Sequence, residues 1–193
     1  MGLMVLDRFS LYAPIYDGFV WMAGVSPVQA LVAESDVKAG ERVLDLGGGT
    51  GRVALALAER GARVTVLDPC WAMLKRAPRH PSVERIQARA QALPLADESF
   101  DLVLCIDALH HIKEAEAALR EAHRVLRPGG RLYVRDFDVR SWRGRAVRLF
   151  EHLLVDDSRF LAPESLSELA QRLGFKGSTR TCSWLEYVYA GEK

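Results

Sequence analysis

Short apolar runs alternate with amphipathic stretches from residue 42 onward. Almost wholly apolar runs of this length predict strands that are buried on both faces of a sheet. Five of them span residues 42–46, 63–67, 83–87, 100–106 and 131–136. Helical spacing of apolar positions predicts helices over residues 50–60, 71–76 and 113–126. This alternation predicts an α/β fold with a mostly parallel sheet and helices on both faces.

The two ends of the chain have a different pattern. Ser26 and Pro27 suit the start of a helix over VQALVAE, with the serine as its cap and the proline at its first position. A predicted helix over residues 163–173 precedes two strand-like runs, residues 178–184 and 186–190. Too few residues separate these runs for a helix, so we expect an antiparallel hairpin at one end of the sheet.

Length and composition narrow the classes of protein. A chain of 193 residues corresponds to one domain, since domains usually run about 100–200 residues. The net charge of +1 argues against a nucleic-acid partner, which would require a strong basic excess. The longest uncharged apolar run, Phe19–Val25, is far shorter than the roughly 20 residues of a membrane span, and the first residues lack the basic region of a signal peptide. Three widely separated cysteines suit a reducing compartment, so we expect a cytoplasmic protein with no membrane partner.

The sharpest chemical signal is the stretch VLDLGGGTGRVA, residues 43–54. A predicted strand here runs directly into four glycines and then into a helix. Ligands of open α/β sheets bind beyond the carboxyl ends of the strands, and glycines there let a ligand contact the backbone. The four glycines are Gly47, Gly48, Gly49 and Gly51. We therefore expect a nucleotide-like cofactor at this turn, rather than a tight turn without a ligand.

Residue spacing separates the candidate cofactors. A dinucleotide loop requires G-x-G-x-x-G, but Arg52 stands where the third glycine is needed, and the lysine of a Walker loop is absent here. The residues fit G-x-G-x-G instead, with Asp45 before the loop and Asp68 at the end of the next predicted strand. A carboxylate at the second position can accept two hydrogen bonds from a ribose. The alternative for Asp68 is a helix cap or an acid in a solvated loop.

Four motifs occur in order along the chain. They are VLDLGGGTGR (43–52), VTVLDPCWAML (64–74), ALPLADESFDLVLCIDALHHI (92–112) and VLRPGGRLYV (125–134). Together they resemble the class I S-adenosylmethionine (SAM)-dependent methyltransferases, and among these the methyltransferase type 11 group. The resemblance implies a Rossmann-like sheet of seven strands, mostly parallel with one antiparallel strand. It also implies SAM as the cofactor.

The resemblance assigns residues to the methionine and ribose parts of this cofactor. Gly47, Gly48 and Gly49 would let backbone groups approach the methionine part, and Gly51 completes the cofactor-binding loop. Asp45 would orient that loop or bind the methionine ammonium, and Cys105 and Ile106 would lie beneath the methionine part. Asp68 would bind the ribose hydroxyls.

Other motif residues are assigned to the adenine. Pro69 and Met73 would flank the base, and Ala90 and Gln91 would meet its edge. Arg89 stands where the family commonly has an acidic residue that reaches adenine. We therefore expect backbone and packing contacts to hold the base in this chain.

Candidate catalytic residues come from two segments. His110 follows the fourth predicted strand beside His111, and Tyr16 lies in an aromatic N-terminal stretch. A base such as His110 is needed only if the acceptor loses a proton on methylation, and the alternative is that both histidines pack the loop. The resemblance implies a helical lid over residues 1–36 and a substrate-covering segment over residues 137–160. No residues have the spacing of metal ligands, so we expect no metal.

These observations predict a single methyltransferase domain, residues 1–193, that transfers a methyl group from SAM to a small-molecule acceptor. We expect it to act as a monomer or a homodimer. Two alternatives stay open: a non-catalytic SAM-binding regulatory protein, and a methyltransferase that acts on protein or nucleic acid. The Asn/Asp-Pro-Pro-Tyr/Phe sequence of nucleic-acid amino methylation is replaced here by residues 106–109, Ile-Asp-Ala-Leu, which disfavours nucleic acid as the acceptor.

Overall fold

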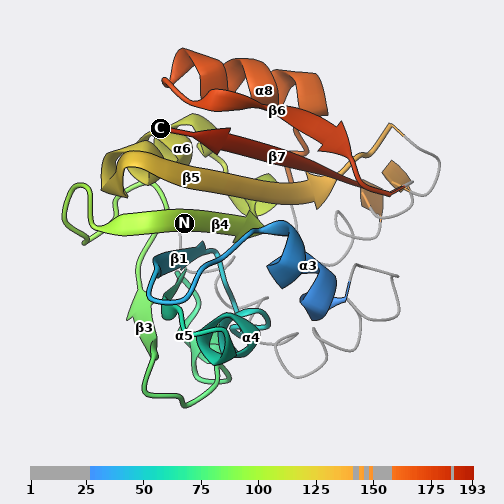
Figure 1. The fold of residues 1–193 in the computed structure, drawn as a ribbon. Coiled ribbons are helices and arrows are strands. Elements are labelled where there is room, and N and C mark those ends of the chain that lie inside the picture. Colours follow the sequence, from blue (N-terminus) through green and yellow to red (C-terminus); the bar gives the residue numbers. More distant parts are fainter. Residues whose placement is uncertain (1–26, 141–143, 146–147, 150–157, 184) are drawn as a thin grey trace.

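Seven strands form one sheet in the computed structural model, which describes residues 27–140, 144–145, 148–149, 158–183 and 185–193. The strands are β1 (Arg42–Leu46), β2 (Arg63–Asp68), β3 (Val83–Gln87), β4 (Phe100–Ile106), β5 (Leu126–Phe137), β6 (Lys176–Thr181) and β7 (Glu186–Glu192). They lie in the order β3-β2-β1-β4-β5-β7-β6 (Figure 1). Strand β7 runs antiparallel to both of its neighbours, and the other pairings are parallel. The expected sheet and its C-terminal hairpin are confirmed.

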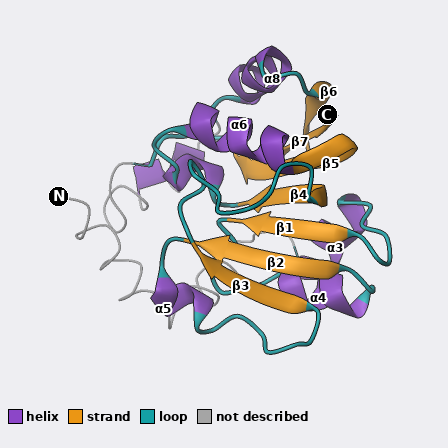
Figure 2. Cartoon of the chain, turned by 90° about the vertical axis from the view of Figure 1, so that its left-hand side faces the viewer, coloured by secondary structure: helices purple, strands orange, loops and turns teal. Residues whose placement is uncertain are grey.

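Helices cover both faces of this sheet (Figure 2). They are α3 (Val28–Glu34), α4 (Ala54–Glu59), α5 (Trp71–Leu74), the 3-10 helix η1 (Leu109–His111), α6 (Ala115–Val125) and α8 (Pro163–Arg172). Apolar residues of α3 and α4, such as Leu57, form a core on one face. Residues of α6 and α8, such as Leu119 and Leu166, form the core on the other. Among the described helices, none is both long enough and apolar enough to cross a lipid bilayer.

Several element boundaries differ from the prediction. The helix predicted from residue 50 begins only at Ala54, because a turn follows β1. Pro27 has an extended backbone and precedes α3 instead of occupying its first position, and Ser26 lies outside the described residues. Strand β5 begins at Leu126, five residues before its predicted start, because Leu126 pairs with Phe100 ahead of an irregularity in the ladder.

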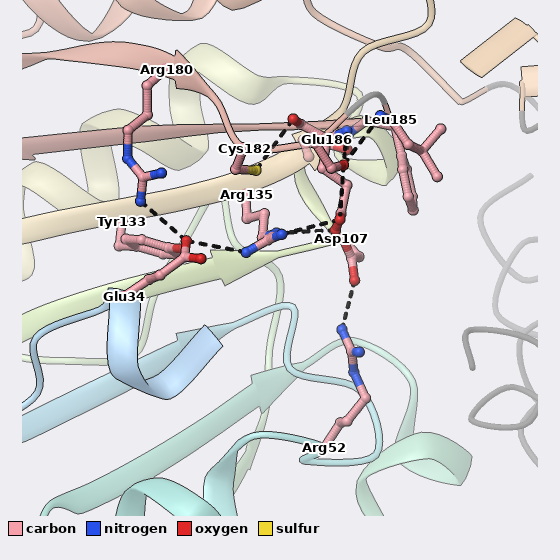
Figure 3. Close-up of polar contacts among 12 residues, drawn as sticks. Glu34, Arg52, Asp107, Tyr133, Arg135, Arg180, Cys182, Leu185 and Glu186 are labelled. Carbon is pink, nitrogen blue, oxygen red and sulfur yellow. Dashed lines mark hydrogen bonds and ion pairs between the residues drawn. The ribbon is translucent and has the colours of Figure 1, made fainter. Parts of the chain in front are cut away.

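An ionic network with a buried Arg–Glu pair at its centre joins β5, β7 and α3 (Figure 3). Arg135 of β5 is 1% exposed and donates to both carboxylate oxygens of Glu186 in β7, at 3.0 and 3.1 Å. Arg135 also bonds Glu34 at the end of α3, which accepts further hydrogen bonds from Tyr133 and Arg180. The position of Arg135 within its strand gives no sign of its partners, so the sequence pattern does not predict this network.

Candidate active site

A cavity opens where the carboxyl ends of β1, β2 and β4 meet. Three segments line it: the glycine turn after β1, the turn and helix after β2, and residues 106–108 with 111–112 after β4. Parallel strands bring their carboxyl ends to one edge, so loops that are distant in sequence converge there. This is the position that the glycine loop predicts for a ligand.

The glycine loop is tightly constrained by its neighbours. Gly47 has a φ of +74°, and a Cβ on it would lie 2.7 Å from the Cβ of Ala108. A Cβ on Gly48 would lie 2.5 Å from Oδ2 of Asp45. Both contacts are too close for any side chain, so these positions require glycine to keep the loop against β4 and over Asp45.

Asp45 lies beneath this loop and does not line the cavity. The residue is 2% exposed, and its Oδ2 has no hydrogen-bond partner among the described residues. Burial raises the pKa of Asp45 to about 7, the Arg52 cation opposes this rise, and the Asp68 charge adds to it. Of the two roles predicted for Asp45, this position favours support of the loop.

Asp68 lines the cavity at the end of β2. Its Oδ2 accepts a hydrogen bond from the backbone N–H of Gly49 at 3.0 Å, and its Oδ1 accepts one from the N–H of Cys70 at 2.7 Å. Burial raises the pKa of Asp68 to about 6, and these two hydrogen bonds oppose the rise. Pro69 and Met73 also line the cavity, so the structure brings them together with Asp68 and the loop glycines. Of the four loop glycines, Gly51 does not line the cavity.

Besides Asp45 and Gly51, three further predicted cofactor residues lie outside the cavity lining. Ala90 and Cys105 are buried in the core on the face that α6 and α8 cover, and neither lines the cavity. Gln91 is also not part of the lining. Successive side chains of a strand point to opposite faces, so Cys105 enters the core while its neighbour Ile106 lines the cavity.

The two histidines after β4 have different surroundings. His110 is 1% exposed, its Nδ1 lies 2.6 Å from Oδ1 of Asp136, and its ring stacks on Phe160 with centroids 4.6 Å apart. His111 lines the cavity, and its Nδ1 lies 3.3 Å from Oγ of Ser158. Burial and the adjacent His110 hold the pKa of His111 well below its usual value, so its ring is neutral at pH 7. The structure thus places His110 behind the cavity wall and His111 in it.

The remaining predicted features are only partly described. Tyr16 lies outside the described residues, as do residues 1–26 of the predicted lid and most of residues 141–157. Within the part of the chain that is described, no group of three or more His, Cys, Asp or Glu residues could hold a metal ion. One feature of the cavity has no signal in the sequence pattern: an ion pair between Arg52 and Asp107, with Nη2 and Oδ2 2.6 Å apart.

Comparison with known proteins identifies the family. A family model described as a methyltransferase domain matches residues 44–134. The ubiquinone/menaquinone biosynthesis C-methyltransferase UbiE of Paracoccus denitrificans is 43% identical over 142 residues, which cover 69% of this chain and 56% of that protein. The chain belongs to the class I SAM-dependent methyltransferases.

Two further relatives extend the comparison. The demethylmenaquinone methyltransferase of Paenarthrobacter aurescens is 39% identical over 147 residues, covering 72% of this chain and 58% of that protein. A SAM-dependent methyltransferase of Thermotoga maritima has a solved structure with a TM-score of 0.79 and 25% identity. The match covers 97% of this chain and 99% of that one. The chain spans about half the length of the curated relatives it matches.

Proposed function

We propose that this methyltransferase domain binds SAM in the cavity at the carboxyl ends of β1, β2 and β4 and transfers its methyl group to a small-molecule acceptor. The carrying observation is that the glycine turn and the Asp68 carboxylate line one cavity. Gly47–Gly49 leave the backbone accessible to a ligand there, and Asp68 supplies acceptors for a ribose. The residues present therefore fit the cofactor.

An aromatic acceptor of the quinone type is the substrate class that we propose. Relatives from Paracoccus denitrificans and Paenarthrobacter aurescens are named for the methylation of such compounds. The cavity wall after β4 includes the apolar side chains of Ile106, Ala108 and Ile112, which suit a flat apolar ring. These two observations favour a small-molecule acceptor over the regulatory and macromolecular alternatives.

Positioning is the main task of this site, because methyl transfer is an in-line displacement between an aligned donor and acceptor. SAM supplies the electrophilic methyl group. Methylation at a ring carbon also removes a proton from the acceptor. The ring of His111 in the cavity wall is placed to receive it, although burial and His110 disfavour the protonated ring. His110 would act at a distance, by holding the loop through its bond to Asp136. The catalytic role of Tyr16 stays a prediction. So do the cytoplasmic location and the monomeric or homodimeric state.

Calorimetry with S-adenosylhomocysteine and with NAD tests the cofactor. We expect micromolar binding of the sulfur nucleotide and none of NAD, because Arg52 breaks the dinucleotide spacing. Transfer of a labelled methyl group from SAM to reduced quinones, simple phenols and amines then tests the acceptor. Binding of NAD without affinity for S-adenosylhomocysteine would refute the cofactor assignment, and labelling of amines alone would refute the acceptor class.

A further inference from the structure

An ion pair lies across the wall of the cavity (Figure 3). Arg52 belongs to the turn after β1, and Asp107 directly follows β4, 55 positions later in the chain. Nη2 of Arg52 lies 2.6 Å from Oδ2 of Asp107. Both residues line the cavity. The pair therefore joins the cofactor-binding turn to the segment that carries His111.

Asp107 has a rare backbone conformation and a buried carboxylate oxygen without a hydrogen-bond partner among the described residues. Its φ of +51° lies in the left-handed region that non-glycine residues rarely adopt, and its N–H donates to the carbonyl oxygen of Arg135 at 2.9 Å. Its side chain is 4% exposed, and Oδ1 has no hydrogen-bond partner within the described ranges. A buried carboxylate oxygen without a partner is unfavourable, and local strain of this kind concentrates at ligand sites. Asp107 thus has one oxygen on Arg52 and a second that a bound donor would satisfy.

Few side chains in the cavity wall can form an ion pair with a charged group of a ligand. Among the lining residues that are described, Arg52 alone carries a permanent positive charge. Each oxygen of Asp68 already accepts one backbone hydrogen bond, from Gly49 or Cys70, and its remaining acceptor positions are the ones proposed for the ribose. Asp45 lies beneath the loop. A ligand carboxylate in this cavity would therefore meet Arg52, and a ligand ammonium would meet Asp107.

We propose that Arg52 and Asp107 together bind the zwitterionic amino-acid end of the cofactor, with Arg52 on its carboxylate and Asp107 on its ammonium. This inference rests on the proposed function. A guanidinium has five N–H donors, so Arg52 can bind a second carboxylate while it still holds Asp107. The guanidinium and the carboxylate of this ion pair are adjacent, as are the carboxylate and the ammonium of an α-amino acid, so the two sets of charges complement each other.

Three ligands separate the contributions of the two charges in calorimetry. S-adenosylhomocysteine carries the whole amino-acid end, its decarboxylated analogue keeps only the ammonium, and 5′-methylthioadenosine lacks both groups. We expect Arg52→Gln to weaken S-adenosylhomocysteine binding by about 10- to 100-fold, the range for charged hydrogen bonds, and to leave the analogue nearly unchanged. We expect Asp107→Asn to weaken both and to spare 5′-methylthioadenosine. Arg42→Gln is the matched control, since Arg42 pairs with Asp101 at the other end of β1 and does not line this cavity.

Wild-type protein alone tests the inference even if a variant fails to fold. Equal affinity for the three ligands, or an Arg52→Gln variant that loses S-adenosylhomocysteine and its decarboxylated analogue to the same degree, would overturn the assignment. Arg52→Lys keeps the charge and should retain part of the discrimination. Absence of S-adenosylhomocysteine binding to wild-type protein would instead refute the proposed function, so the two failures are distinguishable.

Discussion

Among single residues, Asp68 combines a loop contact with a predicted ligand contact. Its carboxylate accepts the N–H groups of Gly49 and Cys70 while it lines the cavity. We expect Asp68→Ala to weaken S-adenosylhomocysteine binding by roughly 10- to 100-fold, since a hydrogen bond to a charged group contributes about 1.5–3 kcal/mol. Calorimetry would measure this, with circular dichroism to confirm the fold. Unchanged affinity in a folded variant would contradict the ribose role.

The adjacent histidines should respond differently to removal. We expect His111→Ala to lower the turnover rate by roughly 10²–10⁴-fold, because His111 lines the cavity and can accept a proton there. His110→Ala should instead lower the free energy of unfolding by about 2–5 kcal/mol, because the change empties a buried site and removes the bond to Asp136. Steady-state kinetics and urea unfolding of both variants test this. If a stably folded His110→Ala protein lost more of its turnover rate than His111→Ala, His110 and not His111 would be the catalytic residue.

At the scale of elements, the Arg135–Glu186 pair links neighbouring strands β5 and β7. Both side chains are almost fully buried. Glu186→Ala should lower the free energy of unfolding by about 3–5 kcal/mol, because it leaves the Arg135 cation buried without this carboxylate. Arg140→Ala is the control: Arg140 pairs with Asp138 and Glu164 at the surface, where a pair contributes about 1 kcal/mol or less. Urea unfolding would measure both variants. An equal loss of the free energy of unfolding in Glu186→Ala and Arg140→Ala would show that the buried pair contributes no more than a surface pair.

Across the whole molecule, three buried carboxyl groups affect stability in the same direction. Burial raises the pKa of Asp45 to about 7 and the pKa values of Asp68 and Asp107 to about 6, from 3.8. The folded protein therefore binds more protons than the unfolded chain between about pH 4 and pH 7. Each unit of pKa difference corresponds to about 1.4 kcal/mol, so each of these groups by itself lowers stability by a few kcal/mol as pH rises through that window.

Denaturant unfolding of the ligand-free protein at pH 5 and at pH 8 tests this effect. We expect Asp45→Asn, which cannot titrate, to show a smaller loss of stability between these pH values than the wild type. An exposed control such as Asp36→Asn should leave the loss unchanged, because its side chain is 77% exposed. A wild type and an Asp45→Asn variant with identical pH dependence would contradict the raised pKa of Asp45.

The order and type of the elements were determined by the sequence itself. Apolar runs mark the inner strands that are buried on both faces, whereas the run at residues 83–87 forms the partly exposed edge strand β3. The hairpin followed from the lack of room for a helix before Glu186. The glycine loop and Asp68 were also predictable, because the close contacts of the turn require glycine at positions that are adjacent in sequence, and Asp68 ends the next strand. Helix starts were less predictable, since Thr50 and its neighbours belong to a turn that contacts between loops constrain.

Only the tertiary structure decided which side chains share the cavity. Adjacent His110 and His111 are equivalent in sequence, but one contacts Asp136 behind the wall and the other lies in the wall. The pairing of Arg52 with Asp107 depends on the meeting of two loops that lie 55 positions apart. The pattern of apolar and polar residues in one segment predicts only the secondary structure of that segment. Charge pairing, burial and the resulting pKa values depend instead on which distant segments the sheet brings together.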